Sequence, residues 1–278
     1  MFGHVSELGG IPIVLFVKKS FRALARVIPQ CGMVSQAVAF NMFLAFFSSL
    51  MLVVGLMSNS LRGNRGTDLA ARLSTILPPG SWQLVSDSLL RREVSPWIWV
   101  LFGWVGTLLV GSQVMKLLME GIHLIYQDRD KPSFLSRQLR GLLLFCVSIL
   151  VWLLALGMSV FRHAFRTLLT RELITSHFIL GLWTVTLAVF GGVLTMLTLA
   201  LIYRVARPVT STWMSVLPGA AVAAMLLWAV SLAFGVYVHR IQYGPVYGGL
   251  AAAIGLMVWM EFSAMVVFLG VAWNAESA

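Results

Sequence analysis

The sequence predicts an all-α, polytopic membrane protein with six transmembrane helices. Hydrophobic residues make up 59% of the 278 residues and charged residues only 11%, against roughly 25% charged in a soluble domain. Six stretches are long and apolar enough to cross about 30 Å of hydrocarbon as helices. None of them shows the alternation of a membrane strand, and unpaired backbone amides are too costly in lipid, so the spans must be helical.

The six spans are expected to form one integral membrane domain that covers residues 1–278. Pro29 and Gly32 place the start of the first membrane helix near Met33. Ser95 and Pro96 have the form of an N-cap and a first helical residue, and they open the second span. The expected spans are residues 33–57, 97–125, 141–161, 178–203, 218–238 and 247–273.

Two further helical segments are expected outside the spans. Residues 5–28 are rich in lysine and arginine and predict an N-terminal interfacial helix. Residues 62–95 separate the first two spans, and in them Leu69, Leu73 and Ile76 recur at helical spacing before a Pro-Pro-Gly break. This pattern predicts an amphipathic hairpin that lies on the bilayer. A substrate gate or a partner-docking element is the alternative.

The charge of the chain is strongly positive, because 20 Lys and Arg residues outnumber 10 Asp and Glu residues. We expect membrane lipids, anionic lipids among them, as partners, and no nucleic acid. The bias of basic residues between the loops is narrow, but a basic cluster precedes the first span. It favours both termini in the cytoplasm. Aromatic residues near span ends are expected to anchor at the interface; they are Trp97, Tyr126, Tyr203, Trp213 and Trp273.

A polar stripe runs along the second span. Its residues are separated by three, four, three and four positions and fall within about 80° of one helix face; they are Gln113, Lys116, Glu120, His123 and Gln127. Polar groups at membrane depth normally face a bundle interior or a wet cavity. The alternative is that this end of the helix emerges into cytoplasmic water, and it applies best to His123 and Gln127.

Two other spans carry polar residues at membrane depth. Glu261 lies near the middle of the last span, where a carboxylate must be protonated or must find a cation, and Lys116 is the candidate. A neutral Glu261, hydrogen-bonded to Ser or Asn, is the alternative. In the first span, Asn41, Ser48 and Gly55 repeat every seven residues, a pattern that favours helix packing over chemistry. The predicted cavity-lining residues are Asn41, Gln113, Lys116, Glu120 and Glu261.

Catalytic and metal-binding motifs are not found in the sequence. The five histidines are scattered and form no HExxH pattern, and no carboxylate cluster could hold zinc or magnesium. A P-loop, a GxSxG elbow and a dinucleotide fingerprint are also missing. We therefore expect no enzyme activity, no catalytic residue, no metal and no cofactor.

Several short motifs are spread along the chain. They are Ser35-Gln-Ala-Val-Ala-Phe-Asn, Leu201-Ile-Tyr-Arg, Val216-Leu-Pro-Gly-Ala-Ala, Phe234-Gly-Val-Tyr, Tyr247-Gly-Gly-Leu-Ala-Ala, Trp259 and Gly270-Val-Ala-Trp-Asn-Ala-Glu. Together they resemble the motifs of one family, the YihY/BrkB bacterial inner-membrane proteins once called ribonuclease BN-like. The resemblance covers most of the chain. It implies six helices, an inner-membrane location and cytoplasmic termini.

The chain also departs from the family pattern. Ser48 follows Phe46 and Phe47 where the family carries a proline, Ala272 replaces a glutamate, and Glu261 replaces an aromatic residue. Residues 261 and 272 are about three helical turns apart and share a helix face. Our hypothesis is that the acidic function has moved to Glu261.

The function expected from these observations is transport or the handling of envelope lipids, with a polar cavity inside the membrane. The competing hypothesis is a non-transporting scaffold that binds a partner. Ribonuclease activity is not expected, because the chain shows no residues that could perform it.

Overall fold

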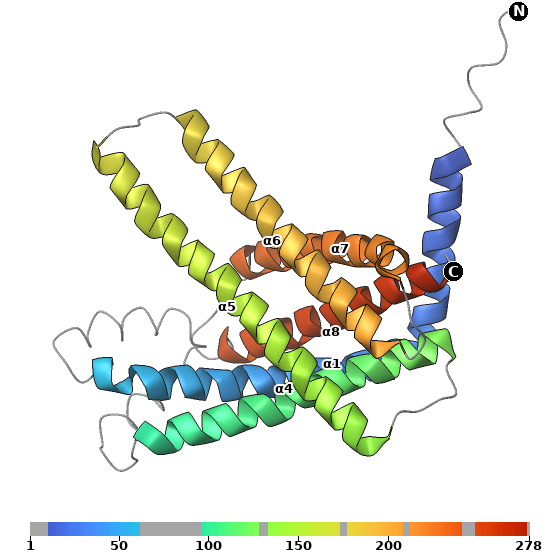
Figure 1. The fold of residues 1–278 in the computed structure, drawn as a ribbon, viewed down its shortest axis with the longest axis horizontal. Helices are drawn as coiled ribbons and strands as arrows, with labels where there is room; N and C mark the ends of the chain where they lie inside the picture. The colour runs from blue at the N-terminus through green and yellow to red at the C-terminus, as the bar shows by residue number, and fades with distance from the viewer. Residues whose placement is uncertain are drawn as a thin grey trace, which may run out of the picture. The chain divides into compact units, whose positions relative to one another are not determined.

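The computed structural model describes residues 11–61, 96–127, 133–172, 177–207, 212–240 and 248–276. These residues form α1 (Ile11–Leu61), α4 (Pro96–Tyr126), α5 (Phe134–Glu172), α6 (His177–Ala206), α7 (Trp213–Arg240) and α8 (Gly248–Ala275), labelled in Figure 1. All six helices contain a segment long and apolar enough to cross a membrane. The described residues contain no strand. The prediction of an all-α protein with six spans is confirmed.

The apolar spans agree with the predicted ones in order but not in every boundary. Within the described residues they are Cys31–Leu56, Trp97–Tyr126, Phe134–Leu154, Ala188–Ala206, Trp213–Val238 and Ala251–Ala275. The third and fifth helices begin earlier than predicted. The carbonyl of Ser133 accepts a hydrogen bond from Arg137 N at 3.0 Å, and that of Thr212 accepts one from Ser215 N at 3.1 Å. These bonds start the helices before Gly141 and Pro218, where the sequence pattern placed the spans.

The first helix also differs from the prediction. α1 is continuous from Ile11 to Leu61 and contains Pro29, so residues 11–28 do not form a separate helix. A proline removes one hydrogen bond but does not always end a helix. At 1.5 Å per residue, 51 residues extend about 75 Å, more than a bilayer core can hold. An interfacial position for the segment before Cys31 stays a prediction, and residues 5–10 and the hairpin at 62–95 lie outside the described residues.

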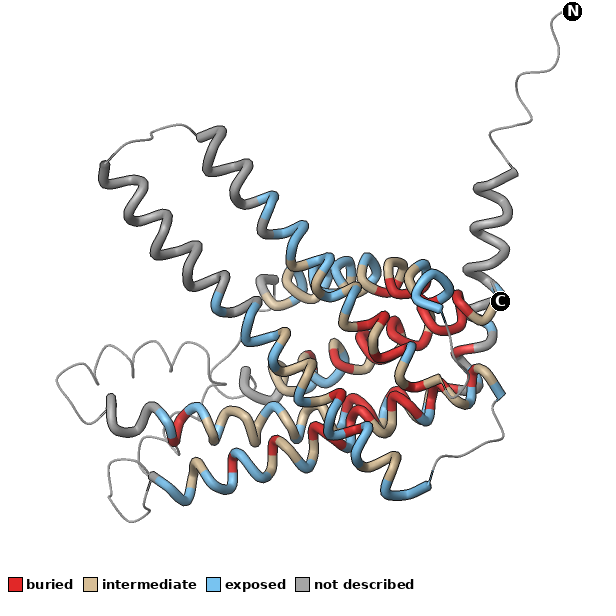
Figure 2. The backbone as a smooth tube through the Cα atoms, in the orientation of Figure 1, coloured by how far each residue is buried: buried red, intermediate tan, exposed pale blue. Residues whose placement is uncertain are grey.

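The chain divides into two compact units. Unit 1 contains Met1–Gly32, Met119–Leu227 and Met265–Ala278, and unit 2 contains Met33–Leu118 and Trp228–Ala264. In unit 1, α5 contacts α6, and the largest fully buried side chains are Phe268, Ile122, Ile125 and Leu144. Figure 2 shows buried residues gathered along the C-terminal half of α8. The prediction of a single domain is not tested by this division.

Glycines bring α1 and α4 close together in unit 2. Gly103 abuts the α1 backbone so closely that a side chain there would overlap it, and a methyl group on Gly106 would lie 2.9 Å from Ser48 Oγ. A methyl group on Gly55 would lie 2.9 Å from Val100 Cγ2. Along these contacts the residue numbers rise in α4 while they fall in α1, so the two helices are antiparallel. Ser48 and Gly55 therefore serve helix packing, as their spacing predicted.

Candidate functional site

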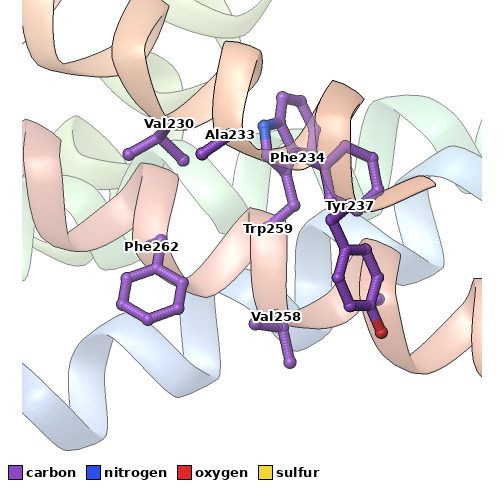
Figure 3. Close-up of a pocket in the computed structure, with 8 residues that line it drawn as sticks. Val230, Ala233, Phe234, Tyr237, Val258, Trp259 and Phe262 are labelled. Atoms are coloured by element: carbon purple, nitrogen blue, oxygen red, sulfur yellow. The ribbon is translucent and has the colours of Figure 1, made fainter. Parts of the chain in front are cut away.

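A cavity of about 390 Å³ lies in unit 2, between the C-terminal half of α7 and the N-terminal half of α8 (Figure 3). Its lining is almost entirely apolar and includes three aromatic rings besides that of Tyr237. The lining residues are Val230, Ala233, Phe234, Tyr237, Gly255, Val258, Trp259 and Phe262. We call this cavity the aromatic groove.

The two walls of the aromatic groove are built in the same way. On each helix the lining residues occupy positions i, i+3, i+4 and i+7, which form one helix face. Phe234 of α7 stacks on Trp259 of α8, with 5.7 Å between ring centroids and 30° between ring planes. Gly255 leaves room for the ring of Tyr237, because a methyl group at that glycine would lie 3.0 Å from Cε1 of Tyr237.

The aromatic groove opens on the outer surface of its helices. The side chains of Phe262, Tyr237 and Val258 are 54%, 45% and 44% exposed. Both helix segments belong to apolar spans. The lining has two polar atoms of note, the Tyr237 hydroxyl and the indole nitrogen of Trp259. Among the described residues, that nitrogen is buried without a hydrogen-bond acceptor.

The five residues predicted to line a polar cavity do not line the aromatic groove. Gln113 and Glu120 are exposed, whereas Lys116, Asn41 and Glu261 are partly exposed. Asn41 donates a hydrogen bond of 2.8 Å to the Ala37 carbonyl of its own helix. Four of the five belong to unit 2, and Glu120 belongs to unit 1. A polar cavity at these residues and an ion pair between Lys116 and Glu261 both stay predictions.

The polar stripe lies on the accessible side of α4. Three residues of α4 that lie between the stripe positions in the sequence are buried; they are Val114, Met115 and Leu118. The stripe continues to the end of the helix, where Gln127 adopts a φ of 54° and its N–H bonds the Leu124 carbonyl at 3.3 Å. The stripe is thus placed to meet water, lipid head groups or another chain.

A second polar constellation is buried in unit 1, where α6, α7 and α8 meet. Asn274 is 3% exposed. Its Oδ1 accepts a hydrogen bond from Gly219 N at 2.7 Å, and its Nδ2 donates one to the Val216 carbonyl at 3.0 Å. The Tyr203 hydroxyl donates to the Val267 carbonyl at 2.7 Å. We call these contacts the asparagine clamp, because they fasten three helices through their backbones.

Two of the expected interface anchors have a different role. Tyr203 and Trp273 are only 3% and 8% exposed, so they belong to the packed interior of unit 1. For Tyr203 the reason is the acceptor that α8 offers its hydroxyl, which lets a tyrosine be buried. Trp97 is 78% exposed and Trp213 43% exposed, which fits an interfacial position.

The motif residues that carry the family resemblance separate into these two places. Phe234, Tyr237 and Trp259 line the aromatic groove, whereas residues of the other C-terminal motifs form the asparagine clamp. Apart from Tyr203, which was expected at the membrane interface, the sequence predicted no role for these residues. The i, i+3, i+4, i+7 spacing of the groove residues is visible in the sequence. It does not single them out, because every residue of an apolar span belongs to some pattern of this kind.

The six long apolar helices define a multi-pass helical membrane protein. The profile of a family described as "Virulence factor BrkB" matches residues 29–278, and the chain belongs to that family. A UPF0761 membrane protein from Tolumonas auensis (strain DSM 9187 / NBRC 110442 / TA 4) is 36% identical over 86 residues. This match covers 31% of the chain and 26% of that relative's length. No solved structure matches the chain.

Proposed function

We propose that the protein handles lipids in the bacterial inner membrane by taking an acyl chain into the aromatic groove. The observation that carries this proposal is an open apolar groove, about 390 Å³ in volume, between two helices that are long and apolar enough to span a membrane. Its volume lies within the roughly 300–1,000 Å³ typical of small-molecule sites. A polar solute would find almost no hydrogen-bonding partner on its walls.

The aromatic walls explain how such a groove would hold an acyl chain. A lipid tail leaves hydrocarbon to enter it, so the hydrophobic effect contributes nothing and the contact must come from packing. Phe234 is stacked on both Trp259 and Tyr237, with centroid distances of 5.7 and 6.2 Å. The stacked rings that form the groove wall change shape less than the surrounding lipid does. We infer that they favour an acyl chain in its extended conformation.

The proposed orientation places both ends of the chain in the cytoplasm. Within unit 1, Arg207 at the end of α6 contacts Tyr126 at the end of α4, and Arg204 contacts Trp213 at the start of α7. The start of α7 in turn contacts the end of α8 through the hydrogen bond between Gly219 and Asn274. These helix ends therefore lie on one side of the membrane. Arg204 and Arg207 are found there, and the excess of basic residues on the cytoplasmic side of membrane proteins supports this assignment.

The groove can be tested with a photoreactive phosphatidylcholine that carries its diazirine on the acyl chain. The full chain is reconstituted in nanodiscs, irradiated, and its labelled peptides are identified by mass spectrometry. Ala233→Phe places a ring in the groove from an exposed position, whereas Ala229→Phe adds the same ring one turn away on α7. We expect Ala233→Phe to lower labelling of α7 and α8 several-fold and Ala229→Phe to leave it unchanged. Equal labelling of both variants would refute the proposal.

The asparagine clamp favours a second candidate, a scaffold that moves no lipid. Its buried side chains join helices through backbone groups, which is what a rigid support requires. A leaflet-exchange assay separates the candidates: vesicles containing the protein and a fluorescent phosphatidylcholine would show faster exchange for a lipid-handling protein. A scaffold would leave the exchange rate at that of protein-free vesicles.

A further inference from the structure

Two arginines in unit 1 are stacked on aromatic rings. Arg204 Cζ lies 4.4 Å from the ring centroid of Trp213, and Arg207 Cζ lies 4.3 Å from that of Tyr126. Arg204 lies in the last turn of α6 and Arg207 directly follows that helix, whereas the rings come from the start of α7 and the end of α4. We call these four residues the stacked-arginine site. Tyr126 is the member of the site that is distant from the others in sequence.

The stacked-arginine site lies where three spans end. Tyr126 is the last residue of one apolar span, Trp213 is the first of another, and Ala206, between the two arginines' positions, ends a third. Tryptophan and tyrosine at such positions mark the level of the lipid head groups. The guanidinium groups therefore lie at the depth where the phosphates of phospholipids are found.

Stacking leaves each guanidinium ready to bind an anion. The ring covers one face of the planar group, whereas the N–H donors point outward in its plane. A planar fork of this kind matches two oxygens of a phosphate, and a stacked fork has less conformational freedom to lose on binding. Arg204 lies in the last turn of α6 and Arg207 directly follows the helix. The two are three residues apart, so their Cα atoms lie within about 11 Å of each other, which two arginine side chains can span. Arg204 is exposed and Arg207 is partly exposed, so both are accessible.

We propose that Arg204 and Arg207 together bind one phosphate group, either the head group of an anionic phospholipid or a soluble phosphate ester. The alternative ligand, a carboxylate, would also fit a single fork. Two forks from residues three apart in the chain suit the larger number of phosphate oxygens better. The proposal does not depend on the aromatic groove, which binds no charge and lies in the other unit.

The test compares three double variants of the full chain by native mass spectrometry in mixed phosphatidylcholine and phosphatidylglycerol micelles. Arg204→Gln with Arg207→Gln removes both forks. Arg137→Gln with Arg140→Gln is the matched control, because it removes two positive charges at the same spacing from the start of α5. Arg204→Lys with Arg207→Lys keeps the charge and loses the fork. Each variant is first checked for an unchanged melting temperature. If the glutamine variant does not fold, the lysine variant is compared with the native chain instead.

We expect the native chain to retain phosphatidylglycerol in preference to phosphatidylcholine, and the Arg204/Arg207 glutamine variant to retain it roughly tenfold less well, because both guanidinium forks that would hold the phosphate are lost. The control pair should retain it as the native chain does, and the lysine pair should be intermediate. Displacement of the lipid by inorganic phosphate supports a soluble ester as ligand, whereas resistance to displacement supports a lipid head group. Equal retention by native chain and glutamine pair, or by lysine pair and native chain, overturns the stacked-arginine site.

Discussion

The side chain of Asn274 is hydrogen-bonded to the backbone of Gly219, with 2.7 Å between Oδ1 and N. The same amide group donates to the Val216 carbonyl at 3.0 Å, so one α8 side chain satisfies two backbone groups of α7. Gly219 and Gly270 permit this approach, because a methyl group on Gly219 would overlap the Gly270 carbonyl. The clamp therefore requires a small residue on each helix as well as the asparagine.

Replacing Asn274 by alanine should destabilise the protein by about 2 kcal/mol, because two buried backbone groups lose their partners in a site that water does not enter. The measurement is unfolding of the detergent-solubilised chain by denaturant. Ser215→Ala is the control, since the Ser215 hydroxyl is exposed and bonds the Thr212 carbonyl of its own helix. An Asn274→Ala variant as stable as Ser215→Ala would show that the clamp contributes nothing.

Replacing Gly270 by alanine should also destabilise the protein, by about 2 kcal/mol, because overpacking a tight interface forces the helices apart. The new methyl group would lie 2.6 Å from the Gly219 carbonyl oxygen and 2.7 Å from Ala223 Cβ. The change in melting temperature of the purified chain measures this effect.

Gly192 and Gly235 provide the comparison for this substitution, because each lies in a helix and no other group lies within 4 Å of an added methyl. Alanine at either position should be neutral or should stabilise by about 0.5–1 kcal/mol through helix propensity. If alanine lowered the melting temperature equally at all three positions, close approach of α7 and α8 would not explain the effect.

Hydropathy predicts most of this fold, because the energetics of a bilayer allow few alternatives. An apolar stretch of about 20 residues must be a helix in lipid, so six such stretches give six spans. Boundaries are harder, since a helix can extend beyond the hydrocarbon in either direction. α5 begins at Phe134, and its first turn is capped by Ser133, whereas hydropathy placed the span from Gly141.

The groove and the clamp could not be predicted, because both depend on which helix faces meet. Charged and polar residues attract attention within an apolar span, so Lys116, Glu120 and Glu261 became candidate residues. The groove consists of apolar residues that look like every other lipid-facing residue until α7 and α8 are placed together. Asn274 is polar, but it lies near the end of its span, where an asparagine gives no signal of burial.

The polar stripe of α4 predicts a path for water into the membrane, and cysteine labelling can test it at Gln113. Both native cysteines lie in apolar surroundings, Cys31 buried and Cys146 exposed, so the background variant carries Cys146→Ser. Gln113→Cys should then react with a membrane-impermeant maleimide in intact cells or vesicles, because the reactive thiolate forms only where water is present. Trp104 is 56% exposed and lies nine residues before Gln113, so Trp104→Cys presents the opposite face of α4. It should stay unlabelled, because an accessible residue on the face opposite the stripe is expected to face lipid. If Gln113→Cys also stayed unlabelled from both sides of the membrane, the stripe would be surrounded by lipid or protein, and a water-filled cavity at Gln113, Lys116 and Glu120 would be excluded.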